Sequence, residues 1–177
     1  FGYNSLANNN TGNDNTAFGC YTLTYNTFGV QNTSVGNYSL YTNQNGFNNT
    51  SVGFNALYSN FSGFNNTAVG INSLFTNIGG FDNTSIGINA LYNSRGSYNT
   101  AVGKGALSDV TLGSNNIGIG DTAQVPNAAG SDQIRLGNIW IGYAGIQVGW
   151  SITSDRRWKS DVMPSNLGLD FITKLNP

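Results

Sequence analysis

Hydrophobic and polar residues follow one another in a unit of 17 residues that repeats along the first two thirds of the chain. Each unit begins with Asn-Thr-(Ala/Ser)-(Val/Ile/Phe)-Gly, and a leucine follows four residues after the glycine. The units start at Asn15, Asn32, Asn49, Asn66, Asn83 and Asn99, with a final step of 16 residues. A fixed short period indicates one structural unit that is stacked on its own copies.

The composition of the unit favours strands and turns over helices. Helical-hairpin repeats need more than about 30 residues, and Asn, Gly, Thr and Ser are poor helix formers. The pattern predicts a short strand at Asn-Thr-Ala-Val, a glycine turn, a second short strand that ends in the leucine, and a longer polar turn. The fold class is therefore an all-β, repetitive β-solenoid or β-roll with 17-residue coils, its strands stacked about 4.8 Å apart.

The alternation within each strand predicts which side chains form the core. Thr67 and Val69 share one face, and Asn66, Ala68 and Gly70 share the other. We expect the valine or isoleucine and the leucine of each coil to be buried. Burial of a large apolar side chain contributes about 1.5–3 kcal/mol, whereas fixing each backbone residue costs about 1–2 kcal/mol. Since a coil this thin is not stable alone, the small face of Ala, Ser and Gly is the predicted contact of a homo-oligomer.

The recurring glycines and asparagines carry separate expectations. Tight corners require positive φ, so Gly53→Val or Gly70→Val is predicted to disrupt the rod, whereas Asn60→Ser in the longer turn is predicted to be tolerated. The Asn column at the start of the units is expected to form a stacked amide ladder. Asn-x-Ser/Thr sequons, as at Asn32, arise automatically in such a repeat, although glycosylation in a eukaryotic secretory context is the alternative.

Charge and cysteine content exclude several classes of function. Charged residues make up 8% of the chain and the net charge is −1, so there is no basic patch for nucleic acid. No apolar run approaches the length of about 18 residues that spans a membrane. Histidine is absent and Cys20 is the single cysteine, which leaves no zinc cluster and no intrachain disulfide. We predict no metal and no cofactor, and a semi-buried Cys20, with an interchain disulfide as the alternative.

Two changes in composition divide the chain. After Gly120 the repeat gives way to a turn-rich connector, which is followed by short alternating segments such as Gln133–Gly142. From about Ser154 onward charged residues become frequent. The predicted organisation is a solenoid shaft or head at 1–123, a β-strand neck at 124–153, and the beginning of a further, truncated domain at 154–177.

The last segment contains two ordered motifs. Residues 154–159 read Ser-Asp-x-Arg-x-Lys, and residues 168–177 read Gly-Leu-x-x-Ile-x-x-Leu-x-Pro. This part resembles the start of the intramolecular chaperone domain of endosialidase-type phage tail spikes, a family also found on tail fibres, neck appendages and giant-virus surface proteins. The upstream Asn-Thr-Ala-Val-Gly units are similar to the head repeats of trimeric autotransporter adhesins. Both resemblances imply a parallel homotrimer.

The chaperone-domain resemblance also implies self-cleavage. In that family the domain trimerises the fibre and then cuts itself off, which here corresponds to a cut between Thr153 and Ser154. Ser154 would be the nucleophile and Lys159 its general base, provided that burial lowers the pKa of the lysine. The chain stops at Pro177, where the family domain continues, and Trp158 stands where Leu, Phe or Tyr is more usual. We therefore expect cleavage in a longer precursor and none in this piece.

Three functions are consistent with these observations. The first is a structural fibre or adhesin segment at a virion or cell surface, hence extracellular, with a host-surface glycan or receptor as partner. The second is a Ser/Lys peptidase whose main output is self-cleavage. The third is ice binding through a threonine ladder, against which stands the placement of the one regular threonine, Thr67 and its equivalents, on the valine face.

Overall fold

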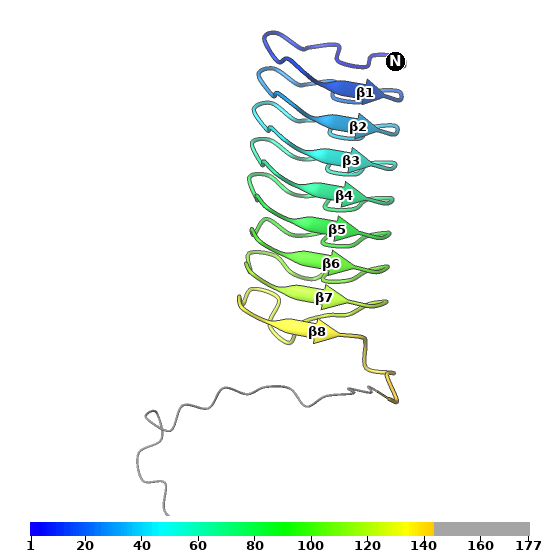
Figure 1. Ribbon diagram of the computed structural model, residues 1–177, viewed down its shortest axis with the longest axis vertical. Helices are drawn as coiled ribbons and strands as arrows, with labels where there is room; N and C mark the ends of the chain where they lie inside the picture. The colour runs from blue at the N-terminus through cyan, green and yellow to red at the C-terminus, as the bar shows by residue number, and fades with distance from the viewer. Residues whose placement is uncertain (144–177) are drawn as a thin grey trace, which may run out of the picture. The chain divides into compact units, whose positions relative to one another are not determined.

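The computed structural model describes residues 1–143 as a stack of coils, each with one short strand (Figure 1). The strands all have three residues and fall on the Thr-(Ala/Ser)-(Val/Ile/Phe) position of successive units or its equivalent. They are β1 (Thr16–Phe18), β2 (Thr33–Val35), β3 (Thr50–Val52), β4 (Thr67–Val69), β5 (Thr84–Ile86), β6 (Thr100–Val102), β7 (Ile117–Ile119) and β8 (Ile134–Leu136).

The strands form one parallel sheet in sequence order, β1 to β8. Each strand pairs in register with its equivalent one coil away, as in Thr50↔Thr67 and Val52↔Val69. Backbone hydrogen bonds also join neighbouring coils outside the strands, as in Leu57 N to Ser73 O at 3.0 Å. The predicted β-solenoid with coils of 17 residues is therefore confirmed, and it has about seven turns.

The segment that ends in the leucine is a turn, so the expected second strand is absent from the described coils. Positive φ angles occur three times in its backbone, at Gly53 (140°), Asn55 (56°) and Leu57 (50°). A leucine in this left-handed region loses roughly 1–2 kcal/mol. Leu57 is fully buried, and burial of such a side chain contributes about 1.5–3 kcal/mol, which offsets the cost.

The face of the strand that is buried in the core is the opposite of the predicted one. Ala68 and Leu74 are fully buried, whereas Val52 is 37% exposed. The reason is the width of the coil, because the leucine side chain fills the space directly across from the middle of the strand. At Gly118, a Cβ atom would lie 2.5 Å from Leu107 Cγ. Only Ala, Ser or Gly fits opposite the leucine, and the valine therefore points outward.

Small polar groups inside the solenoid are hydrogen-bonded to one another within a coil and between successive coils. The Oγ atoms of Ser39 and Ser51 lie 2.6 Å apart, and Ser51 Oγ donates to the carbonyl oxygen of Ala56 at 2.8 Å. Both serines are fully buried. Because a buried hydroxyl without a partner costs about 1–3 kcal/mol, these bonds explain why serine and alanine alternate freely at the inner strand position.

Two ladders of buried asparagines run along the stack. In the first, which was predicted, Asn66 donates its Nδ2 to Asn49 Oδ1 at 3.1 Å and to Gly80 O at 2.9 Å. The second ladder was not predicted and lies in the longer turn, where Asn43 donates to Asn26 Oδ1 at 2.7 Å. Its fully buried members are Asn26, Asn43, Asn60 and Asn77, and it begins at the half-buried Asn9. Amide ladders of this kind are a feature of stacked strands.

The ladder of strands extends into the segment for which the sequence predicts a neck. The short strand expected at Ile134 is confirmed as β8, and it continues the 17-residue register through the pair Ile117↔Ile134. One compact unit spans Phe1–Ile141. The proposed boundary near Ser154 lies outside the described residues.

Candidate functional site

The residues predicted to carry out self-cleavage, Thr153, Ser154 and Lys159, lie outside the described residues, so their roles stay predictions. Within residues 1–143 there is no group of three or more His, Cys, Asp and Glu side chains that could hold a metal ion. The same residues contain no helix with the length and apolar character needed to cross a membrane. Cys20 is exposed, so the expectation of a semi-buried thiol was wrong.

The outer face of the sheet is the first candidate surface. Two columns of side chains run along it, one of threonines and one of apolar residues. The threonines are Thr16, Thr33, Thr50, Thr67, Thr84 and Thr100, and the apolar column contains Phe18, Val35, Val52, Val69, Ile86, Val102, Ile119 and Leu136. Exposure in the apolar column reaches 41% at Ile86 and 55% at Leu136. Neither column contains a charged side chain.

This arrangement corrects two expectations. The small side chains of Ala and Ser point into the coil, so they cannot form the predicted subunit contact. The threonines lie on the solvent side together with the valines, as Thr50 and Val52 do in β3. The objection to ice binding, that the threonine shares a buried valine face, is therefore wrong.

A ladder of aromatic rings forms the second candidate surface, in the turn that follows the buried leucine. Tyr41, Tyr58, Phe75 and Tyr92 are stacked with ring centroids 5.0–5.1 Å apart. The side-chain hydrogen bond with Tyr25, together with burial and neighbouring tyrosines, raises the pKa of Tyr41 to about 12. A second ladder, Phe47–Phe64–Phe81, has centroids 4.8 Å apart.

Three ladders end within the coil at residues 83–98 or directly before it. The stacked tyrosine column stops at Tyr92, because Ser108 occupies the equivalent position in the next coil. An outer amide ladder, in which Asn72 donates to Asn89 Oδ1 at 3.1 Å, stops because Gly105 follows Asn89 in its column. The inner ladder stops at Asn77, whose buried Oδ1 has no partner among the described residues. This coil is also the one with 16 residues.

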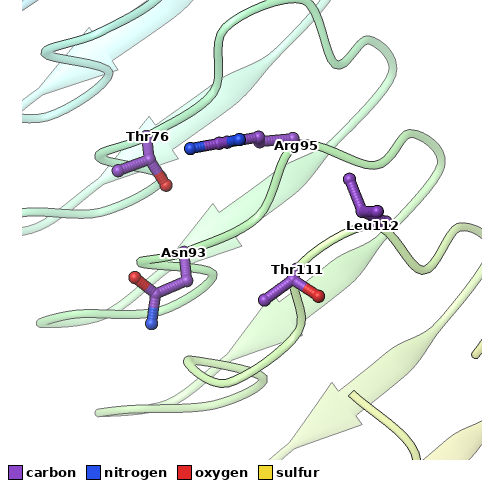
Figure 2. Close-up of a pocket in the computed structure, with 5 residues that line it drawn as sticks. All are labelled: Thr76, Asn93, Arg95, Thr111 and Leu112. Carbon is purple, nitrogen blue, oxygen red and sulfur yellow. The ribbon is translucent and has the colours of Figure 1, made fainter. Parts of the chain in front are cut away.

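The ladder ends leave a notch of about 320 Å³ in the surface, lined by Asn72, Asn89, Tyr92, Asn93 and Ser108. A separate recess of about 330 Å³ lies beside it, lined by Thr76, Asn93, Arg95, Thr111 and Leu112 (Figure 2). The side chain of Arg95 extends toward Thr76 and away from Leu112 (Figure 2). At this recess the turn from Leu91 to Gly96 is one residue shorter than the equivalent turn from Leu74 to Gly80.

Neither the notch nor the outer sheet face could be located from the sequence by residue type alone. The signal that points to the notch is the interruption of a column, in which Ser108 follows four aromatic residues. Comparisons with models of protein families, with curated proteins and with solved structures each return no match for this chain.

Proposed function

We propose that this chain is a structural rod segment of an extracellular or virion-surface fibre, and that it assembles as a parallel homotrimer through the outer face of its sheet. The observation that carries the proposal is the continuous, uncharged column of exposed and half-buried apolar residues from Phe18 to Leu136. Exposed apolar stripes of this length mark interaction surfaces, because monomeric proteins rarely leave them open to water.

A further copy of the same chain is the occupant that fits this face best. The face carries no charges, so two copies meet without repulsion, and the constant spacing of the columns lets equivalent coils align in a parallel arrangement. The described coils have little other apolar burial, since those from Asn15 to Tyr98 each contribute one leucine and at most one alanine to the core. A shared interface would bury the valine column that a single chain leaves exposed.

Light scattering of the intact chain under native conditions tests the assembly. The expected mass is about three times the 18.8 kDa chain mass. Val69→Asp, which places a charge in the middle of the apolar column, should shift the mass toward that of one chain. Ser62→Asp places the same charge at an exposed position in a turn and should leave the trimer intact. A stable monomer of the parent chain would contradict the proposal.

The resemblance at residues 150–177 adds a maturation step to this proposal. A longer precursor would trimerise and then cut itself between Thr153 and Ser154, with Ser154 as nucleophile and Lys159 as general base. Ser154→Ala and Lys159→Ala should each abolish the cut, as measured by intact mass. A precursor cut equally well with Lys159→Ala would remove the lysine from the scheme. A host-surface glycan or receptor is the proposed partner of the mature fibre.

Ice binding is the second candidate function, and the outward threonine column favours it. Six threonines from Thr16 to Thr100 lie one per coil on the exposed face, at the regular spacing of stacked strands. Thermal hysteresis measurements separate the two functions. Activity that is lost in Thr67→Leu would support ice binding, whereas a trimer that buries the face would have none.

A further inference from the structure

We infer that the notch at the ladder ends, lined by Asn72, Asn89, Tyr92, Asn93 and Ser108, is a binding site for a neutral pyranose ring. Its volume of about 320 Å³ lies at the lower end of the range of small-molecule sites. The inference deepens the proposed surface role and rests on it for the source of the sugar. The chemistry of the site lies within one chain and needs no particular number of subunits.

The ring of Tyr92 is the last of its ladder, and only one of its faces stacks on another ring among the described residues. One face of the ring stacks on Phe75, with centroids 5.1 Å apart and planes 8° from parallel. Inside the ladder both faces are occupied, as at Tyr58, which stacks between Tyr41 and Phe75. Ser108 is too small to cover the second face of Tyr92. An exposed aromatic face of this kind is suited to the C–H groups on one side of a pyranose.

Polar groups with free hydrogen-bonding capacity flank that ring. Asn89 accepts from Asn72 through Oδ1, and its Nδ2 has no protein acceptor within residues 1–143. Asn93 donates its Nδ2 to Ser108 O at 3.0 Å, which leaves its Oδ1 as an acceptor at the notch. A donor and an acceptor beside an apolar platform match the hydroxyl groups around a sugar ring.

The charge of the lining selects among sugars. All five lining residues are uncharged, and tyrosine, serine and asparagine offer donors and acceptors without a cation. An acidic sugar would find no counter-charge in this lining, whereas a neutral hexose needs none. The nearby Arg95 belongs to the adjoining recess.

Titration of the intact chain with simple sugars, followed by the side-chain amide signals of Asn89 and Asn93 in NMR spectra, tests the site directly. The probes are methyl β-D-galactopyranoside, methyl β-D-glucopyranoside and the tetrasaccharide of whichever sugar binds. We expect shifts of these amide signals with a Kd on the order of 1 mM. Tighter binding of the tetrasaccharide indicates a glycan chain as the natural source, and equal binding indicates free sugar. Absence of shifts with both monosaccharides would overturn the inference.

Ser108→Tyr is the decisive variant, because it continues the aromatic ladder and covers the open face of Tyr92 without removing a ring from the stack. We expect sugar binding to weaken by at least about tenfold. Tyr92→Ala should weaken it similarly. Ser62→Tyr places the same new ring in another turn and should leave binding unchanged. Unaltered affinity for the sugar in Ser108→Tyr would overturn the site. Displacement of the bound sugar by adenosine at a concentration lower than that of the sugar would also overturn it.

Light scattering on the same samples keeps the two proposals separate. A monomer whose Asn89 and Asn93 signals respond to sugar would contradict the proposed trimer and support the site. A trimer whose amide signals do not respond to sugar would support the proposed assembly and contradict the site.

Discussion

The side-chain Nδ2 of Asn60 donates a hydrogen bond of 2.7 Å to Oδ1 of Asn43, its equivalent one coil earlier. The same Nδ2 donates to Gly63 O at 2.9 Å, and Asn60 Oδ1 accepts from Asn77 at 2.7 Å. Asn60 is fully buried. The amide therefore joins three successive coils through an interior that water does not reach.

The Asn60 ladder reverses the expectation that Asn60→Ser is tolerated. Serine is too short to reach both neighbours, and each buried polar group left without a partner costs about 1–3 kcal/mol. We expect Asn60→Ser to lower the free energy of unfolding by at least about 2 kcal/mol, measured by urea denaturation. Asn45→Ser, at an exposed position of the preceding coil, should stay within about 0.5 kcal/mol of the parent. Equal midpoints for the two variants would contradict the role of the ladder.

Glycines in the stack differ sharply in their tolerance of a side chain. Gly53 has φ 140°, and a Cβ atom there would lie 2.5 Å from Gly70 O. Gly53→Val should therefore prevent assembly of the rod, seen as loss of the cooperative thermal transition. Gly79 meets nothing closer than Ser62 Oγ at 3.4 Å, so Gly79→Ala should melt at or slightly above the parent temperature. A folded Gly53→Val rod would refute the steric argument.

Gly105 is a position where the structure predicts a gain in stability. Its φ of 63° matches the left-handed angles of Asn55, Asn72 and Asn89 in the same column, and a Cβ atom there has room, with Thr122 Cγ2 at 3.4 Å. Gly105→Asn should extend the outer amide ladder and raise stability by about 0.5 kcal/mol. Gly105→Ala, which lacks the amide, should lower it by roughly 1 kcal/mol. Differential scanning calorimetry measures the stability of both variants against the parent.

The stability of the rod should depend on pH in the alkaline range through Tyr41. Its hydrogen bond with Tyr25, followed by burial, raises the pKa from 10.0 to about 12. A raised pKa in the folded state means that the contribution is fully present below pH 10 and is lost as the pH rises through 12. Tyr41→Phe should therefore flatten the fall in unfolding free energy between pH 10 and pH 12. Parallel pH profiles for parent and variant would contradict this assignment.

Much of the backbone could be predicted from the sequence because its signals are local and repeated. The 17-residue spacing gave the coil, the Thr-(Ala/Ser)-Val segment gave the strand, and the positive φ of Gly53 and Gly70 was expected at the corner. Asn66 was expected in an amide ladder and lies in one. Each of these depends on one coil and its immediate neighbours.

The inside and outside of the strand could not be assigned in the same way. A three-residue strand such as Thr67–Val69 has two faces, and hydrophobicity favoured the valine for the interior. The decisive quantity was the space left by the buried leucine, since a Cβ atom at Gly118 would already lie 2.5 Å from Leu107 Cγ. That volume depends on the turn geometry, in particular on the positive φ of Leu74 (52°), which leucine rarely adopts. The notch beside Tyr92 was missed because it arises where the aromatic and asparagine columns are not continued in the next coil.

The coil at residues 83–98 affects how the stacked coils unfold under mechanical tension. In a stack whose units contact only their neighbours, stability is a sum of terms for each coil and each interface. The interfaces before this coil include ring stacks and outer amide bonds, whereas the one after Tyr92 has Ser108 and Gly105 in those columns. Strands and the Asn83–Asn99 bond continue across it. We therefore expect tension applied at the C-terminal end to unzip the coils after Tyr92 at lower force than the coils before it.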